Sequence, residues 1–216
     1  MDLVARGFQR LIRRSLQRGL RGVWIRGQPP VGPAIYAANH HGWWDGYLAG
    51  FWLWSAGLQP GLLMRAEQLQ RFPLFRRLGA IGSGELRGAL ELLRSRPLII
   101  FPEGRILPAG PLGALAPGAT WLAKQASVPL IPLAIRTALR GHEFPEAYLR
   151  LGEPCSGRQL PSQLAHLVSQ TDLLAQVSDP ERPLPGFSLL LRGRSSSSER
   201  LGAANRALEI LLERGA

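Results

Sequence analysis

Apolar runs of three to eight residues recur along the chain, and each is bounded by proline, glycine or polar residues. This pattern is typical of buried strands. One of the runs, Val128–Ile135, carries two prolines, which predicts an edge strand, a strand start or a bulge and not a regular central strand. The predicted strands are Gly22–Gly27, Ala34–Ala38, Gly79–Ile81, Leu98–Phe101, Val128–Ile135 and Ala147–Gly152.

Longer stretches between these runs have helical patterns, so helices alternate with strands and the chain is predicted to have an α/β fold. The length of 216 residues fits one domain. We divide it into a helix at 1–21, a core at 22–154 and a C-terminal extension at 155–216 packed on that core. The extension contains a proline-rich loop and a serine linker, Ser195–Ser198. The predicted helices are Leu3–Leu20, Trp44–Leu58, Arg65–Leu78, Glu85–Arg94, Ala119–Ala126, Gln159–Val177 and Glu199–Arg214.

The first helix is amphipathic and basic. Its apolar arc and its basic arc face opposite ways at about 100° per residue. One interpretation places the helix in a membrane interface with its arginines on anionic headgroups. The other is an ordinary helix packed on the domain with a solvated basic face. The apolar arc holds Val4, Phe8, Leu11, Ile12 and Leu16, and the basic arc holds Arg6, Arg10, Arg13, Arg14 and Arg21.

Composition narrows the class of protein. Hydrophobic residues make up 45% of the chain, which is enough for a folded core. Cys155 is the single cysteine and fits a reducing compartment. The net charge is +11 and comes almost entirely from arginine, which suits an anionic partner: a lipid surface, an acidic carrier protein or nucleic acid. We expect no secretory signal and no membrane span, because the apolar stretch Tyr47–Leu58 is too short to cross a bilayer.

The strongest candidate chemistry follows the strand Ala34–Ala38, where the sequence reads Asn39-His40-His41-Gly42-Trp43-Trp44-Asp45. His40 lies at the carboxyl end of a strand, where open α/β sheets place their active sites. Residues five apart point about 140° away from each other on one helix. His40 and Asp45 therefore meet only if His40 is in the loop and Asp45 is in the first helical turn, which would give a base with an orienting carboxylate. The alternative is a locally satisfied pair with no catalytic role.

A second strand, Leu98–Phe101, leads into Pro102-Glu103-Gly104-Arg105. This turn delivers a carboxylate and a guanidinium, and two charged strand ends at one sheet edge favour an active site there. No serine or cysteine nucleophile lies beside His40. We therefore expect His40 to act on a hydroxyl of a substrate.

Together these motifs resemble the glycerolipid acyltransferase family, which includes the lysophosphatidate acyltransferases. The resemblance rests on Asn39-His40 with Asp45, on Phe101–Gly104, and on two further blocks, and it extends over roughly Val23–Pro154. It implies a single-domain α/β sandwich whose mixed sheet is flanked by helices. The further blocks are Met64–Glu67 with Pro73–Phe75 and Gly79–Ile81, and Pro117–Ala119 with Val128–Ile135.

The resemblance also implies roles for individual residues. His40 would be the general base and Asp45 its orienter in transfer of an acyl group from acyl-coenzyme A or acyl-carrier protein to a lysolipid hydroxyl. No covalent acyl-enzyme and no cofactor are needed. Glu103 and Gly104 match the acceptor-binding turn, and Arg105 is suited to a phosphate because a guanidinium holds two oxygens at once.

The sequence departs from the family pattern around the acceptor. Gly82-Ser83-Gly84 stands where a bulky residue and an arginine are usual, and Arg105 replaces the usual threonine. Arg65, Arg87 and Arg105 could still form a phosphate clamp. The alternative is a neutral acceptor, such as a glycolipid or a glycosylated carotenoid.

Three other interpretations remain open at this point. His40, His41 and Asp45 could bind a metal, although no further histidine or cysteine lies nearby in the sequence. A basic nucleic-acid-binding module fits the charge and the tryptophans but shows none of the usual recognition motifs. A catalytically inactive relative is the third. We expect instead a peripheral membrane acyltransferase on the cytoplasmic face, with a lipid acceptor, a thioester donor, an optional carrier protein and no nucleic acid as partners.

Overall fold

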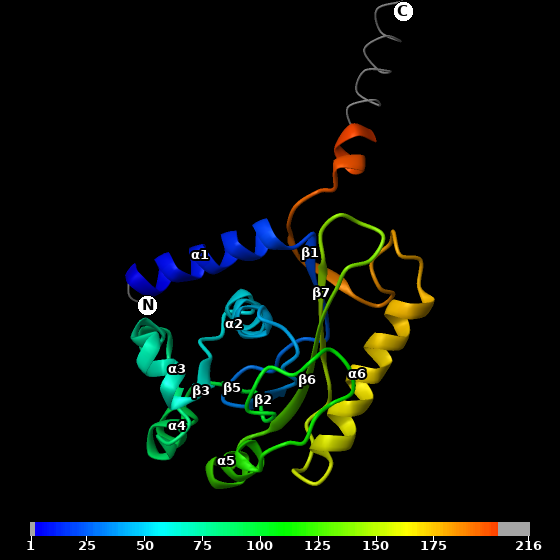
Figure 1. The fold of residues 1–216 in the computed structure, drawn as a ribbon. Coiled ribbons are helices and arrows are strands. Elements are labelled where there is room, and N and C mark those ends of the chain that lie inside the picture. Colours follow the sequence, from blue (N-terminus) through cyan, green and yellow to red (C-terminus); the bar gives the residue numbers. More distant parts are fainter. Residues whose placement is uncertain (1–2, 203–216) are drawn as a thin grey trace, which may run out of the picture.

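Eight strands form one mixed sheet in the computed structural model, which describes residues 3–202 (Figure 1). The strands are β1 (Gly22–Arg26), β2 (Ile35–Ala38), β3 (Gly61–Met64), β4 (Ala80–Gly82), β5 (Leu98–Ile100), β6 (Leu130–Ala138), β7 (Glu146–Leu151) and β8 (Ser188–Arg192). Their order across the sheet is β4-β3-β5-β2-β6-β7-β1-β8. Neighbours from β4 to β6 run parallel, whereas β7 runs antiparallel to β6 and β8 antiparallel to β1.

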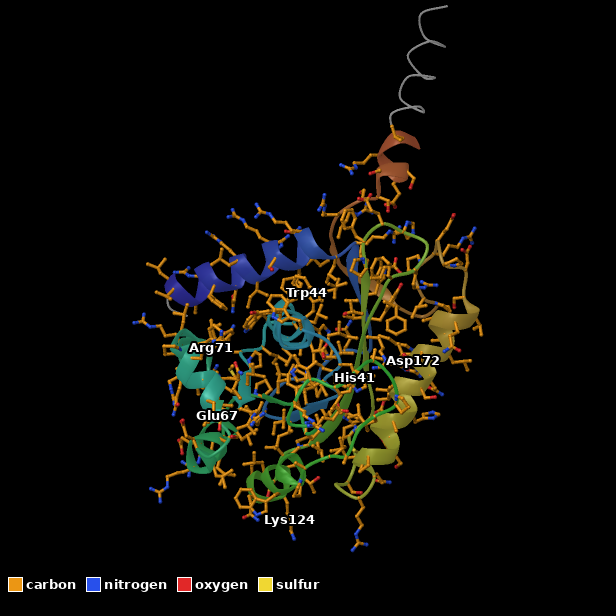
Figure 2. The ribbon with its side chains drawn as sticks, in the orientation of Figure 1. His41, Trp44, Glu67, Arg71, Lys124 and Asp172 are labelled. Atoms are coloured by element: carbon orange, nitrogen blue, oxygen red, sulfur yellow. The ribbon has the colours of Figure 1, made fainter. Side chains whose placement is uncertain are left out.

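Helices cover both faces of the sheet, which explains why the central strands are apolar on both sides. Along β2, Ile35 and Ala37 contact one helical layer, and Tyr36 and Ala38 contact the other. The first layer contains α4, α5 and α6, and the second contains α1 and α2, so that Lys124 and Trp44 lie on opposite sides (Figure 2). The helices are α1 (Leu3–Gly19), α2 (Asp45–Ser55), α3 (Ala66–Arg71), the 3-10 helix η1 (Pro73–Leu78), α4 (Leu86–Leu92), α5 (Gly118–Ala126) and α6 (Leu160–Val177).

The amphipathic helix α1 packs on the domain. Ile12 and Leu16 are buried against α2 and the sheet, and Phe8 meets Phe75 of η1 edge to face with ring centroids 5.4 Å apart. Val4 and Leu11, which the sequence placed on the apolar arc, lie at its margin and are 39% and 59% exposed. The arginines of the opposite arc that lie within α1 are exposed.

Two predictions from the sequence are wrong in detail. The helix expected over Arg65–Leu78 is divided into α3 and η1, because Pro73 lacks the N–H that a continuous helix needs and forces Phe72 out of the helical region (φ −127°, ψ 67°). The strand β6 was not expected to be a regular central strand, but it lies in the centre of the sheet.

The geometry of β6 explains how a central strand accepts proline. Pro129 precedes the strand. Pro132 lies within it, and its carbonyl accepts a hydrogen bond from Gly152 at 2.9 Å. The backbone nitrogen and carbonyl of one strand residue point to the same side, so the nitrogen of Pro132 faces the end of β7. The pairing of β6 with β7 ends at Leu133 opposite Leu151, so few backbone hydrogen bonds remain to be made there.

Two strands have no counterpart among the sequence predictions. The first is β3, a four-residue run between β4 and β5. The second is β8, which belongs to the C-terminal extension and pairs with β1. The extension therefore contributes an edge strand to the sheet of the core, and its helix α6 packs on β6.

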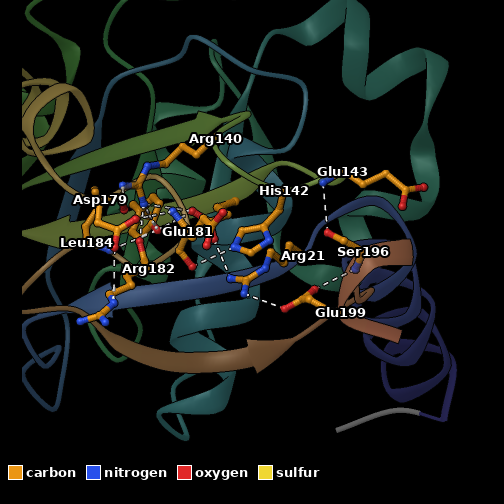
Figure 3. A network of polar contacts seen from close by, with 12 residues as sticks. Arg21, Arg140, His142, Glu143, Asp179, Glu181, Arg182, Leu184, Ser196 and Glu199 are labelled. Carbon is orange, nitrogen blue, oxygen red and sulfur yellow. Dashed lines mark hydrogen bonds and ion pairs between the residues drawn. The ribbon is translucent and has the colours of Figure 1, made fainter. Parts of the chain in front are cut away.

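The segment after β8 is also held to the core. Ser196 is 3% exposed, and its hydroxyl accepts the N–H of Glu143 at 3.1 Å, so Ser195–Ser198 is not a free linker (Figure 3). Arg21 bonds both the fully buried carboxylate of Glu146 (2.7 Å) and that of Glu199 (2.9 Å). Residues 197–202 are helical, and the rest of the helix predicted at Glu199–Arg214 lies outside the described residues. Across residues 3–202, no helix combines the length and the apolar character that a membrane crossing requires.

Candidate active site

The loop after β2 is fixed to the neighbouring strand by an asparagine side chain. Asn39 is fully buried. Its amide donates to the carbonyl of Ile135 at 3.0 Å and accepts the N–H of Ile135 at 2.8 Å. The side chain thus replaces the two backbone bonds that β2 would have made with β6 had the strand continued. The next residue, His40, is therefore held at the carboxyl end of β2.

His40 and Asp45 meet as the spacing predicted, with the histidine in the loop and the aspartate at the start of α2. His40 Nδ1 lies 3.0 Å from Asp45 Oδ2. The same oxygen accepts the backbone N–H groups of His41 and Gly42, each at 2.8 Å. Because a carboxylate can only accept here, Nδ1 carries the proton and Nε2 is left as the basic nitrogen.

The imidazole of His40 is also fixed from the side. It stacks on the ring of Phe101 with centroids 4.3 Å apart and an interplanar angle of 25°. Its side chain is 20% exposed, and no residue within 3–202 hydrogen-bonds to Nε2. Nε2 is therefore free to take a proton from a bound molecule.

The turn after β5 supports this loop. Gly104 has a φ of 70°, a conformation that favours glycine, and its N–H closes the turn onto the carbonyl of Phe101 at 2.9 Å. Glu103 points inward and is fully buried. Its Oε2 accepts the backbone N–H of His40 at 2.6 Å, and its Oε1 accepts that of Gly113 at 2.8 Å. Glu103 therefore holds the His40 loop in place.

A pocket of about 700 Å³ opens beside His40. Most of its wall is apolar and comes from β3, α2, η1, β5 and α5, with Ile12 of α1 also contributing. Tyr47 is part of the wall, and burial raises the pKa of its hydroxyl. The polar side chains that line the pocket include His40, Arg65, Gln68, Ser83 and Arg105. An apolar cavity with a few polar side chains in its wall fits an amphiphile.

Comparison with known proteins identifies this arrangement. The family model described as Acyltransferase matches residues 23–136, which include β1, β2, the His40 loop, the Glu103 turn and most of β6. The chain belongs to the acyltransferase family. Its fold is similar to the crystal structure of the 1-acyl-sn-glycerophosphate (LPA) acyltransferase PlsC from Thermotoga maritima, with a TM-score of 0.63 and 18% sequence identity. The match covers 81% of this chain and 80% of that one.

The family and the contacts of His41 bear on two of the interpretations that the sequence left open. The family match and the α/β fold, which is similar to that of a lysophosphatidate acyltransferase, favour an enzyme over a nucleic-acid-binding module. A metal site built on both histidines does not fit the contacts, because Glu103 and Arg136 occupy the two ring nitrogens of His41. Within residues 3–202, no three metal-ligating side chains are grouped around one point.

The three arginines proposed for a phosphate clamp do not all line the pocket. Arg65 and Arg105 line the pocket, and Arg65 is 63% exposed with Glu67 at 3.7 Å. Arg87 lies on the exposed side of α4 and does not line the pocket. Glu103 carries its carboxylate inward, so its side chain is not open to an acceptor.

An unpredicted ion pair links η1 to the start of α4. Arg76 binds Glu85 through both guanidinium nitrogens, at 2.6 and 3.0 Å. Hydrogen bonding to Glu85 raises the pKa of Arg76, and the same contact lowers the pKa of Glu85. The carboxylate packs against Gly82, where a Cβ would approach it to 2.8 Å. Gly82 thus leaves room for this ion pair.

Arg136 and Asp172 are not among the residues that the sequence pattern singles out, and His41 is among them only as a possible metal ligand. All three lie behind the His40 loop. One signal for Arg136 was available: it is a charged residue directly after the apolar run Val128–Ile135, the same signature that pointed to His40. No local pattern indicates Asp172, which α6 brings to β6 from 36 residues away.

Proposed function

We propose that this acyltransferase moves a fatty acyl group from acyl-coenzyme A or acyl-carrier protein to the hydroxyl of a lysolipid-type acceptor, with His40 as the general base. The observation that carries the proposal is the His40–Asp45 pair, whose free Nε2 borders an apolar pocket of about 700 Å³. The pair supplies the base, and the pocket suits an acyl chain.

In the proposed reaction, His40 Nε2 takes the proton of the acceptor hydroxyl while its oxygen attacks the thioester carbonyl carbon. The carbon–oxygen bond forms, the carbon–sulfur bond breaks, and the thiolate takes the proton back from His40. The products are an ester and a free thiol, with no covalent acyl-enzyme. Asp45 stabilises the imidazolium between the two proton transfers, and binding both substrates beside one base supplies proximity.

For the acceptor we propose a phosphate-bearing lysolipid. The support is the position of Arg105, directly after the Glu103-Gly104 turn, together with Arg65, which lines the same pocket. Both are exposed enough to meet a headgroup, and an arginine–phosphate contact contributes about 1.5–3 kcal/mol. Arg87 is left out of this arrangement because it lies outside the pocket. A neutral glycolipid acceptor is the competing case, in which these arginines would not matter.

An acceptor panel tests the proposal. Radiolabelled acyl-coenzyme A and acyl-carrier protein are each offered with lysophosphatidate, glycerol phosphate, lysophospholipids and neutral glycolipids. We expect transfer to a phosphate-bearing acceptor, and we expect Arg105→Leu to raise its KM about 10- to 100-fold. Arg87→Leu, with the same charge change outside the pocket, is the matched control. Transfer to a glycolipid that is insensitive to Arg105→Leu would contradict the phosphate assignment.

We also propose that the enzyme works as a peripheral protein on the cytoplasmic face of a membrane. The support is α1, whose solvent face carries five exposed arginines and no acidic residue, with Leu3, Val4 and Leu11 exposed beside them. Such a face suits an anionic bilayer, where a lipid acceptor resides. The free Cys155 fits a reducing compartment.

A further inference from the structure

A chain of polar contacts runs from α6 to the backbone of His40. It begins at Asp172, whose two oxygens bind Arg136 Nε at 2.6 Å and Nη2 at 2.7 Å. Arg136 is the residue of β6 that directly follows Ile135, whose backbone is hydrogen-bonded to the Asn39 side chain. The guanidinium therefore lies immediately behind the catalytic loop. Figure 2 shows Asp172 on α6 and His41 in the interior of the molecule.

The next contact fixes the protonation of His41. Arg136 Nη1 meets His41 Nδ1, and because a guanidinium has only donors, Nδ1 must be the unprotonated acceptor. The proton is then on Nε2, which donates to Glu103 Oε1 at 3.1 Å. His41 is thus a neutral imidazole between a guanidinium and a carboxylate, and its side chain is 4% exposed.

The last contact reaches the proposed base. Glu103 Oε2 accepts the backbone N–H of His40 at 2.6 Å. Arg136 also donates to the carbonyl of Gly110 at 2.5 Å, and Glu103 accepts the N–H of Gly113, so the loop after Glu103 is bound at two points. Every group between Asp172 and His40 is therefore hydrogen-bonded to its neighbour.

We propose that His41, Arg136 and Asp172 are positioning residues for the acyl transfer: they fix the backbone of His40 through Glu103 and so set the direction of Nε2. The inference rests on the proposed role of His40. It gives the C-terminal extension a part in catalysis, because Asp172 lies beyond the segment 23–136 that the family model matches. None of the three lines the pocket beside His40.

Loss of these contacts should act by displacing His40, because catalysis by proximity depends steeply on the distance between the reacting groups. A misplacement of about 1 Å can cost roughly 100-fold in rate. Removing Arg136 leaves two buried acceptors, His41 Nδ1 and the Gly110 carbonyl, without their donor. His41 would then turn to find another partner, and the Glu103 carboxylate would move with it.

The test compares His41→Leu with His41→Gln, and Arg136→Met with Arg136→Lys. The amide of glutamine can donate to Glu103 and accept from Arg136 at once, as the neutral imidazole does, whereas leucine can do neither. We expect kcat to fall about 10- to 100-fold in the leucine and methionine variants with KM within about threefold. Glutamine and lysine should recover most of that loss.

A second network supplies matched controls. The Arg140 side chain is 4% exposed and binds the buried Glu146 at 3.3 Å, and His142 Nε2 donates to the carbonyl of Glu181 at 2.9 Å (Figure 3). Arg140→Met therefore disturbs a comparably buried arginine away from the pocket, and His142→Leu removes a histidine contact that is more exposed than that of His41. They should lower the melting temperature and leave kcat near the wild-type value.

A spectroscopic readout separates position from stability. The chain has four histidines, so ¹⁵N spectra of histidine-labelled protein resolve their tautomers. We expect His41 in the Nε2–H form in the wild type, and a change at both His41 and His40 in Asp172→Asn, whose partly exposed site keeps the fold intact. Unchanged His40 signals in that variant would overturn the proposal.

The kinetic outcomes also separate this inference from the proposed function. If His40→Ala is inactive but Arg136→Met and His41→Leu retain kcat within twofold, the positioning role is wrong and the general base stands. If His40→Ala remains active, the proposed function itself fails. A kcat loss in Arg140→Met as large as that in Arg136→Met would also overturn the inference, because any weakened core would then produce it.

Discussion

At the scale of residues, the proposed base is oriented by four contacts. Asp45 holds Nδ1, Phe101 stacks on the ring, and Glu103 accepts the backbone N–H. The carbonyl of His40 accepts the N–H of Leu107 at 2.8 Å. Because three of these contacts come from the segment that follows β5, the direction of Nε2 is a property of the assembled fold and not of the His40 loop alone.

Loss of the Asp45 carboxylate should lower catalysis much more than it lowers stability. In Asp45→Asn the amide nitrogen can turn towards His40 and donate to Nδ1, which would place the imidazole proton on Nε2 and remove the base. We expect kcat to fall about 10²- to 10⁴-fold. The free energy of unfolding should fall by only about 1–3 kcal/mol, because the oxygen of the new amide can still accept one or both backbone N–H groups.

Steady-state kinetics and urea denaturation measure the two quantities. Asp179→Asn is the control, since Asp179 also accepts a backbone N–H, that of Glu181 at 2.9 Å, but lies far along the chain from the pocket. A kcat loss below tenfold in Asp45→Asn would show that Asp45 only caps the loop.

Local spacing was enough to single out His40, Asp45 and the Glu103 turn, because His40 and Glu103 follow closely on apolar strands and Asp45 begins the helix after the His40 loop. The orientation of Glu103 was not predictable, because its partners His41 and Gly113 lie 62 and 10 residues away in the sequence. The same holds for Arg87: its helix α4 places it outside the pocket, and no spacing rule gives that direction.

At the scale of elements, α1 approaches the end of the His40 loop at the ring of Trp44. A Cβ at Gly19, the last residue of α1, would overlap the indole ring of Trp44, which directly precedes Asp45. Glycine at this position therefore lets the helix and the start of α2 approach closely. Most helices and strands were predictable from apolar periodicity. The exceptions are β3 and β8, which have no predicted counterpart, and α3–η1, whose division depends on Pro73.

A pair of glycine substitutions tests this contact. Gly19→Ala should destabilise the protein by about 1–3 kcal/mol, because Trp44 must move, and it should lower kcat through Asp45. Gly7→Ala changes the same helix where a Cβ meets nothing within 4 Å, and it should stabilise by about 0.5–1 kcal/mol. Chemical denaturation gives both values, and a neutral Gly19→Ala would contradict the packing of α1 on Trp44.

At the scale of the whole molecule, the sequence indicates the fold class but not the order of the strands or the way in which α1 packs. The α/β class was predictable from alternating strands and helices. The strand order was not, because β8 joins β1 across some 170 residues, with Gly22 opposite Arg192. The structure also resolves the two faces of α1: Ile12 and Leu16 are buried in the core, so only the basic face and its margin remain for a membrane.

Binding to vesicles with and without anionic phospholipid tests that surface. Each arginine near an anionic bilayer contributes about 1 kcal/mol, so Arg10→Gln with Arg14→Gln should weaken partitioning about 30-fold at low salt and less at high salt. Lys124→Gln with Arg158→Gln removes the same charge from exposed sites outside α1. Equal losses from the two pairs, measured by co-sedimentation, would show that net charge alone drives binding.

The central claim is that His40 takes the proton of the acceptor hydroxyl. It is tested most directly by the rate of acyl transfer in His40→Ala, measured with the best donor and acceptor of the wild type and in protein of matched melting temperature. A general base contributes about 10²- to 10⁴-fold, so we expect kcat to fall by at least 100-fold with little change in KM. Transfer by His40→Ala within tenfold of the wild-type rate would contradict the account.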